Sequence, residues 1–310
     1  MTRSLVRITL RLMLVSSCLV LLAIATGQAI NLGENELVFN GLLDQRQTDI
    51  YVMDLAHRLA YRLTNSRASE SEPVWSPDGQ QIAYVTGYVN ENTGGSSVII
   101  INLKNHTSHR VSSDITNEGY PQWSPDGRYL AFGKVPYSGG IPELIIYDLQ
   151  TGRTHHINDH PRSASFPTWS PDGRYIAFTS GARDPEQYEI HVIDLQTGEI
   201  RPLLPSDGGF MPTWSPDGHY IVFKTIGGNA HIYLWDVFQK RTIVLYEPAE
   251  TYTLTFSWSP DSKTVTYSTL RGVFRLEIAA CIQDPITCSP ELLTFPNGVY
   301  HDPNWRPRAS

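Results

Sequence analysis

The chain has 310 residues, of which 41% are hydrophobic, so a single domain of this length can bury a sizeable core. Its formal net charge is −7, and the first thirty residues contribute arginines but no acid, so the remainder is more acidic still. An acidic chain is repelled by phosphate backbones, which argues against nucleic acid as a partner.

The first 29 residues have the features of an export signal. Arg3, Arg7 and Arg11 precede an apolar run over residues 12–25, and residues 27–29 resemble a small-x-small cleavage site. The run is shorter than the roughly 20 residues that a spanning helix needs, but an uncleaved N-terminal membrane anchor stays an alternative. Cys18 lies in a loose match to a lipobox, although the apolar run continues beyond it. We therefore expect a periplasmic or other extracytoplasmic protein, with membrane contact only through this segment if it is not cleaved.

A repeated motif, Trp-Ser-Pro-Asp-Gly, divides the rest of the chain. Four full copies and two weaker ones recur every 44 to 48 residues, and they begin at Trp75, Trp123, Trp169, Trp214, Trp258 and Trp305. A period in the mid-forties is typical of β-propeller blades with four strands each. Only Trp235 among the tryptophans lies outside this register.

The same four segments return within each repeat. The Trp segment is followed by a turn in which Pro, Asp and Gly suit successive positions, and then by an alternating strand such as residues 82–84. A third strand, such as residues 144–148, is more continuously apolar and ends in a polar residue, and its apolar run is expected for a strand covered on both faces. A shorter edge strand, such as residues 110–112, completes an antiparallel blade.

The two ends of the chain complement each other. The first strand, residues 37–39, has no Trp segment before it, and the Trp305 segment has no second strand after it. We therefore expect residues 30–310 to form one all-β domain, a six-bladed β-propeller with four-stranded antiparallel blades. Its ring should be closed by the C-terminal strand, which joins the N-terminal blade and removes two exposed edges.

These segments resemble the TolB-like β-propeller repeat over about residues 35–307. That repeat occurs in the periplasmic component of the Tol-Pal system, in other envelope proteins and in peptidase-associated propellers. TolB carries an α/β domain ahead of its propeller, which has no counterpart in the short stretch before Leu37. The resemblance therefore implies the scaffold rather than the Tol-Pal role, because this repeat encodes blade geometry.

Residue types that could support chemistry have structural interpretations. Cys281 and Cys288 are the only cysteines after the leader, and export favours a disulfide between them. His155, His156 and His160, near Asp159, are the only hint of a metal site, but they come from one repeat, so we expect no metal there. The repeated acids should belong to separate turns: Asp78, Asp126, Asp172, Asp217 and Asp261.

The residues just before each Trp strand should lie nearest the propeller axis, on the face opposite the repeated turns. The loops on that face differ in length and chemistry, as binding loops on a rigid scaffold do. The expected mouth consists of Glu72, Tyr120, Phe166, Met211, Tyr252, Thr255, Tyr300 and Asp302. A mouth rich in aromatic side chains suits recognition of a peptide or protein segment.

We therefore expect an exported, monomeric binding module for a protein or peptide of the cell envelope, without catalytic residues, cofactor or metal. The alternative is a small-molecule-binding, glycan-binding or metal-dependent lyase-type propeller that uses the central mouth. Several histidines and carboxylates converging on the axis would favour the alternative. An aromatic rim without such a set would favour the first interpretation.

Overall fold

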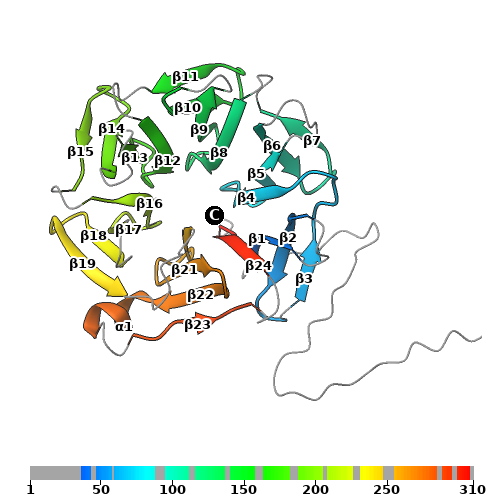
Figure 1. Ribbon diagram of the computed structural model, residues 1–310. Helices are drawn as coiled ribbons and strands as arrows, with labels where there is room; N and C mark the ends of the chain where they lie inside the picture. Colours follow the sequence, from blue (N-terminus) through cyan, green and yellow to red (C-terminus); the bar gives the residue numbers. More distant parts are fainter. Residues whose placement is uncertain are drawn as a thin grey trace, which may run out of the picture.

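The computed structural model describes residues 36–42, 47–57, 59–87, 95–111, 116–136, 140–157, 163–181, 188–204, 208–225, 231–246, 255–284, 288–294 and 299–307. The fold of these residues is an all-β propeller, whose sheets are arranged radially around a central axis (Figure 1). The expected leader and Tyr252 lie outside the described residues. Within the described part, no helix is long and apolar enough to cross a membrane.

Four sheets have four strands each, and all their neighbouring strands are antiparallel. One contains β24 (Val299–Trp305), β1 (Glu36–Leu42), β2 (Asp49–Asp54) and β3 (Leu59–Arg62). The next contains β12 (Ser163–Trp169), β13 (Tyr175–Gly181), β14 (Tyr188–Asp194) and β15 (Ile200–Pro202). Another contains β16 (Phe210–Trp214), β17 (Tyr220–Lys224), β18 (Ile232–Asp236) and β19 (Arg241–Tyr246). The last contains β20 (Phe256–Trp258), β21 (Thr264–Thr269), β22 (Gly272–Glu277) and β23 (Glu291–Leu292).

The remaining sheet has eight strands, which departs from the expectation of six separate four-stranded blades. Its first half contains β4 (Glu70–Trp75), β5 (Gln81–Gly87), β6 (Ser96–Asn102) and β7 (Ser108–Arg110). Its second half contains β8 (Thr116–Trp123), β9 (Tyr129–Pro136), β10 (Glu143–Asp148) and β11 (Thr154–Ile157). The halves are joined because β6 and β8 form a parallel pairing, Ser96 with Asn117. The Glu118 carboxylate strengthens the joint by accepting the Val98 amide hydrogen at 3.0 Å.

Each inner strand ends in a repeated tryptophan that packs between sheets. Five of the six are at most 9% exposed, namely Trp75, Trp123, Trp169, Trp258 and Trp305. The indole N–H groups of Trp169 and Trp258 donate to carbonyls of the preceding inner strand, at 3.2 and 3.0 Å. Burial of an aromatic side chain at the same place in each repeat holds neighbouring sheets at a fixed separation. Trp214 is the exception and is only half-buried.

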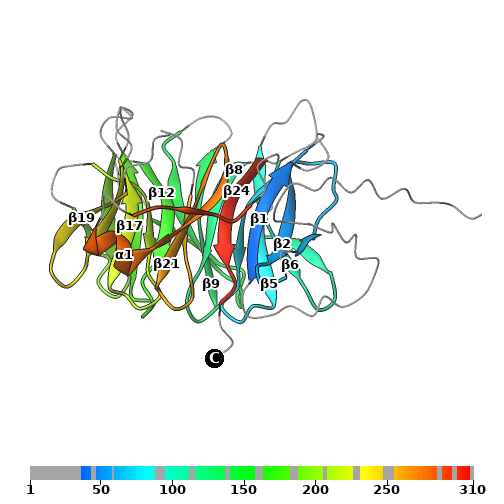
Figure 2. The same ribbon diagram turned by 90° about the horizontal axis from the view of Figure 1, so that it is seen from below.

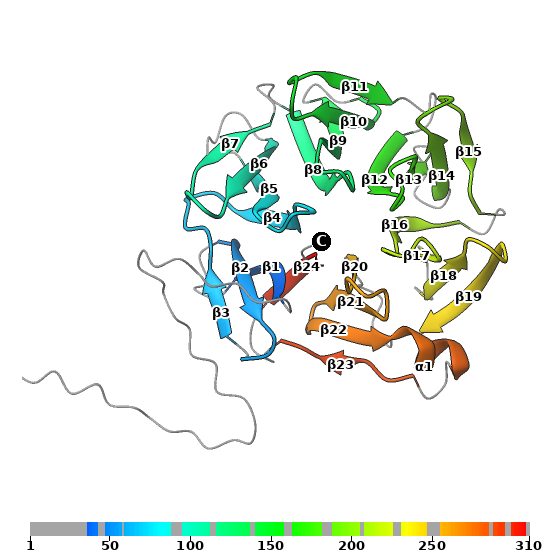
Figure 3. The same cartoon turned by 180° about the vertical axis from the view of Figure 1, so that it is seen from behind.

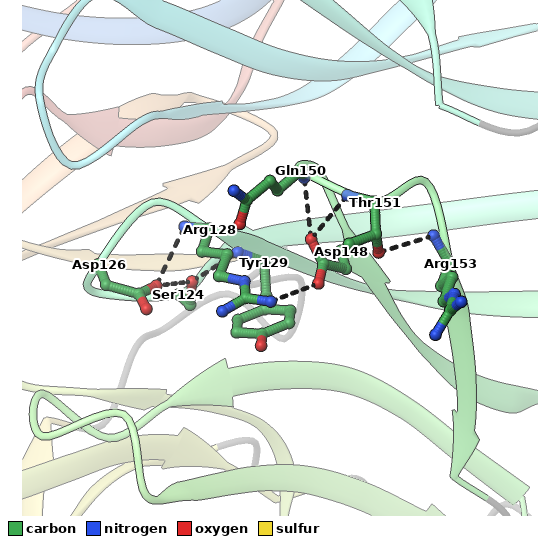
Figure 4. Close-up of polar contacts among 8 residues, drawn as sticks. All are labelled: Ser124, Asp126, Arg128, Tyr129, Asp148, Gln150, Thr151 and Arg153. Atoms are coloured by element: carbon green, nitrogen blue, oxygen red, sulfur yellow. Dashed lines mark hydrogen bonds and ion pairs between the residues drawn. The ribbon is translucent and has the colours of Figure 1, made fainter.

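The repeated turns are built as the sequence predicts (Figure 4). Asp126 accepts hydrogen bonds from the Ser124 hydroxyl and from the Arg128 amide, at 2.5 and 3.0 Å. Gly127 has a φ of 70°, a conformation that glycine adopts without strain. Arg128 then reaches the next turn and pairs with Asp148 at 2.9 Å. The corresponding acids of the other repeats accept the same bonds within their own turns, so they do not form a carboxylate cluster.

The C-terminal strand β24 completes the sheet that the N-terminal β1 begins, and the two strands lie side by side in Figure 2. Leu37 pairs with Trp305, and Arg306 forms an ion pair with the buried Glu36 at 3.1 Å. The β24 strand also contacts the sheets on either side of it. The Asn304 side chain accepts the Trp75 amide hydrogen at 3.0 Å, and the Trp305 amide donates to the Ser257 hydroxyl at 3.2 Å.

The single helix in the described residues, α1 (Ile278–Gln283), lies at the outer edge of the molecule (Figure 3). It carries Cys281, which forms the expected disulfide with Cys288, and their Cα atoms are 4.8 Å apart. Ile278 and Cys281 are buried in the same core cluster as Leu245 of β19. The helix therefore packs the β20–β23 sheet against the β16–β19 sheet.

Deleting residues 303–310 should strongly destabilise the protein, because it removes Trp305 and the Arg306–Glu36 pair and leaves β1 with an unpaired edge. Loss of a buried tryptophan alone costs about 3–5 kcal/mol. Thermal unfolding followed by circular dichroism should show a lower midpoint, while deletion of residues 308–310 alone should leave the midpoint unchanged. Equal melting of the longer deletion and the full chain would contradict a stabilising role of β24.

Candidate functional site

The inner strands are interrupted just before the tryptophan by a bulge of two residues. Their pairing with the second strand shifts between Ser71 and Val74, and at the equivalent places in β8, β12 and β16. The first bulged residue has a positive φ of 51–56° in five repeats, namely Glu72, Tyr120, Phe166, Met211 and Asp302. A proline follows each of them, and proline is tolerated there because the ladder is already broken.

This conformation is unfavourable for residues other than glycine. A residue held in a sparsely populated backbone region costs on the order of 1–3 kcal/mol and persists only where the surrounding structure imposes it. Here the bulge gives the same position of five repeats one shared backbone conformation. The recurrence of the conformation at five equivalent positions indicates that the arrangement is a built feature of the fold.

Four of the eight expected mouth residues line one cavity on the axis. The cavity has a volume of about 40 Å³, and Glu72, Tyr120, Thr255 and Asp302 contribute to its wall. Phe166 extends the wall, because its ring centroid lies 4.0 Å from that of Tyr120.

The remaining three expected residues are placed differently. Met211 does not line this cavity, and its amide donates to the Thr179 hydroxyl at 3.1 Å. Tyr252 lies outside the described residues, as does the side chain of Tyr300, although the backbone of Tyr300 belongs to β24.

Two carboxyl groups meet at this cavity. The Glu72 amide donates to Asp302 Oδ2 at 3.3 Å, and the Glu72 carboxylate accepts the Tyr120 amide hydrogen. Asp302 also accepts from the Thr255 hydroxyl. The sequence separation of 230 residues between Glu72 and Asp302 explains why their association is not visible in a single repeat.

Burial and mutual repulsion favour the protonated form of this pair. Burial, followed by the negative charge of Asp302, raises the pKa of Glu72 to about 8. The pKa of Asp302 is also raised, mainly by burial. Two close carboxyl groups in a buried site resist ionising together, so the pair should hold at least one proton at neutral pH.

Sequence reasoning missed an aromatic extension of the mouth. The ring centroid of Phe210 lies 4.6 Å from that of Phe166 and 5.2 Å from that of Tyr188. Lys224 Nζ lies 5.4 Å from the centroid of Phe210, and burial lowers the pKa of Lys224 to about 8. Phe210 directly precedes Met211, the residue that we expected at the mouth in this repeat. An aromatic residue next to that position was therefore the signal in the sequence. We call the series Tyr120, Phe166, Phe210 and Tyr188 the aromatic run.

A larger cavity occupies the axis toward the repeated turns. Its volume is about 450 Å³, and its wall consists mainly of the repeated tryptophans and prolines. The repeated turns on that face did not lead us to expect a cavity there. Because most of these indole rings are buried between the sheets, their principal contacts are with protein.

The histidine cluster does not converge on the axis. His155 and His156 lie on the outer strand β11, and His156 Nδ1 lies 2.9 Å from Glu143 Oε2. Asp159 and His160 are not among the described residues. Within the described part of the chain, no group of three or more His, Cys, Asp or Glu side chains could hold a metal ion.

Residues 120–310 match the family model described as the TolB beta propeller domain. A search of curated protein sequences finds no match.

Several solved structures are similar to this chain. TolB from Acinetobacter baumannii has 21% identity and a TM-score of 0.73, over 89% of this chain and 68% of that chain. A putative TolB from Agrobacterium tumefaciens has 16% identity and a TM-score of 0.64, over 89% and 100% of the two chains. An oligogalacturonate lyase in complex with manganese has 16% identity and a TM-score of 0.53, over 76% and 82%. At these identities the structural similarity shows the fold alone.

Replacing Glu72 by Gln should change how stability depends on pH. An acid whose pKa is raised on folding stabilises the native state fully below its unfolded pKa of about 4.5. That contribution is lost as the pH rises through about 8, the folded value. The free energy of unfolding of Glu72→Gln, relative to the unaltered protein, should therefore increase between pH 5 and pH 9, by on the order of 1–3 kcal/mol.

The measurement is chemical denaturation at a series of pH values. Glu199→Gln, which changes an exposed turn acid, is the matched control and should show no such trend. A pH-independent difference for Glu72→Gln would mean that the carboxyl is not protonated in the folded protein.

Proposed function

The chain belongs to the TolB β-propeller domain family, and from this premise we propose that it is a protein- or peptide-binding scaffold of the cell envelope. Its binding site is the mouth formed by the bulged ends of the inner strands. Export through the N-terminal segment, either cleaved as a signal peptide or retained as an anchor, delivers the protein to the periplasm. The protein acts as a monomer.

The proposal includes a closed ring of six blades. The eight-stranded sheet corresponds to two blades, because each half contains one complete repeat and the halves share a single parallel pairing. Together with the four other sheets this gives six blades, and the pairing of β24 with β1 closes the ring. Hydrogen bonds from β24 to both neighbouring sheets support this interpretation.

One observation carries the functional proposal: equivalent bulges gather side chains from different sheets around one axial cavity. The Trp-Ser-Pro-Asp-Gly turns are nearly the same in successive repeats, whereas the bulged residue changes from acid to aromatic to thioether. Constant turns are sufficient to explain the scaffold. Variation at positions that share one strained conformation is what a recognition surface requires.

The mouth also has a chemical polarity. At one end the Glu72–Asp302 pair offers carboxyl oxygens, and the aromatic run leads away from it toward Lys224. A cationic group of the partner would bind the carboxyl pair best when both carboxyl groups are ionised. Apolar side chains would pack on the aromatic run, where aromatic surface provides contact area at a low cost in conformational entropy.

A small-molecule-binding or lyase-type propeller is the second candidate, since an oligogalacturonate lyase has a similar fold. That lyase was solved with manganese. The mouth of the present chain brings together two carboxyl groups beside an aromatic wall. The aromatic wall supports a protein- or peptide-binding scaffold more strongly than a small-molecule-binding or lyase-type propeller. We propose no catalytic residue.

Replacing Tyr120, Phe166 and Met211 together by Ala should weaken partner binding with little effect on folding. Truncation of interface aromatics commonly costs 1–2 kcal/mol or more each, so capture of envelope proteins should fall at least about tenfold. The measurement compares immobilised unaltered and triple-variant chains, at equal amounts of folded protein, by quantitative mass spectrometry of what each retains.

Asp126→Ala is the control on the opposite face. Asp126 accepts hydrogen bonds only within its own turn in the contacts described above, so this variant should lose some stability but retain capture in proportion to folded protein. Equal capture by the triple variant, with loss of capture by folded Asp126→Ala, would place the binding site on the turn face.

A further inference from the structure

One cleft on the turn face combines several departures from the repeat. It lies between the β12–β15 sheet and the β16–β19 sheet and has a volume of about 520 Å³. Trp214 contributes to its wall and is the one repeated tryptophan that is not fully buried. Its indole N–H donates to Gly218 O in its own turn, at 3.4 Å, instead of to the neighbouring sheet. Trp235, the tryptophan outside the repeat register, lines the same cleft.

Phe238 is the third departure. The turns after β10, β14 and β18 share one geometry, in which an Asp side chain accepts the backbone N–H two residues later. That later residue is Gln150 in the first turn (Figure 4), Gln196 in the second and Phe238 in the third. The Phe238 side chain is 68% exposed, although burying an aromatic side chain normally stabilises a protein.

The ion pair that covers this turn in the neighbouring sheets is also replaced. Arg128 pairs with Asp148 at 2.9 Å, and Arg174 pairs with Asp194 at 2.7 Å. The residue equivalent to these arginines is His219, whose ring lies 4.6 Å from that of Phe238. The change leaves an aromatic surface where the other repeats have a polar one.

Cations flank this surface. Lys240 and Arg201 both line the cleft, both are exposed, and neither is ion-paired within the described residues. Lys240 has a φ of 51° at a position where the equivalent residues are Gly152 and Gly198, so a lysine stands where glycine would be unstrained. The two acids at the cleft, Asp172 and Asp217, accept hydrogen bonds within their own turns.

Volume alone does not distinguish this cleft. The equivalent cleft between β8–β11 and β12–β15 is larger, at about 740 Å³. It retains the buried Trp169, and its residues equivalent to His219 and Phe238 are Arg174, which pairs with Asp194, and Gln196. Of these two clefts, only the one that contains Phe238 combines an exposed aromatic side chain with unpaired cations, among the residues that the structure describes.

We propose that this cleft is a second docking surface, which binds a segment of a protein partner that carries an aromatic side chain flanked by carboxylates. The partner's ring packs against Phe238 and Trp214, and its carboxylates approach Lys240 and Arg201. The surface lies on the opposite face from the mouth, so both can be occupied at once.

The test uses the full mature chain and fluorescein-labelled synthetic nonapeptides. The first peptide has one phenylalanine with two aspartates on each side, the second has lysines in place of the aspartates, and the third has alanine in place of phenylalanine. Fluorescence anisotropy should show saturable binding of the first peptide and at least about tenfold weaker binding of the other two.

The double variant Phe238→Gln with Lys240→Gly restores the residues that the repeat has in its other turns, so it should fold normally. It should bind the first peptide at least about tenfold more weakly. The matched control Gln150→Ala changes an equivalent turn and should bind as the unaltered protein does.

Three results would overturn the proposal. The first is no saturable binding of the aspartate peptide at protein concentrations up to about 1 mM. The second is equal binding of the lysine peptide. The third is unchanged binding to the double variant, and loss of binding in Tyr120→Ala would then place the peptide in the mouth.

Discussion

Burial of one tryptophan per repeat against the neighbouring sheet is the interaction on which the rest of the structure depends. It fixes the C-terminal end of each inner strand, because the indole ring fills the space between two sheets. In Trp169 and Trp258 the indole N–H also donates a hydrogen bond to the neighbouring sheet. Once these ends are fixed, successive sheets can only fan out around an axis. Three of the bulged residues, Glu72, Tyr120 and Asp302, then line one cavity on the axis.

Each inner strand therefore has two tasks, separated by three residues. Its tryptophan end is nearly constant and contributes stability, while its bulged end varies and contributes recognition. The positive φ of the bulged residues is a local cost that the packed tryptophan and the adjoining turn can sustain. The buried Glu72–Asp302 pair is a second local cost at the same place, since burial raises the pKa of both carboxyl groups. Concentration of unfavourable features at one site, on an otherwise consistent scaffold, is typical of function.

The sequence was sufficient to predict the features that recur. The spacing of the tryptophans predicted the propeller, the unmatched ends predicted the pairing of β1 with β24, and Cys281 was correctly paired with Cys288. Features that depend on contacts between distant repeats were not predictable in this way. The link between Glu72 and Asp302, the stacking of Phe210 on Phe166 and the parallel joint at Ser96 each require two elements whose relative position only the fold defines. The exposed Phe238 lies within a single turn and was visible in the sequence. It was not predicted because only the residues common to all the turns were compared.

Both proposed surfaces consist of residues that differ from those at equivalent positions of the other repeats. They lie on opposite faces of the propeller. Partner binding at the mouth can be tested by hydrogen–deuterium exchange of the protein, alone and with a captured partner bound. Exchange should be slower at the bulges of β4, β8, β12 and β24 in the complex, and unchanged in the turn that contains Asp78. Unchanged exchange at those four bulges would contradict binding at the mouth.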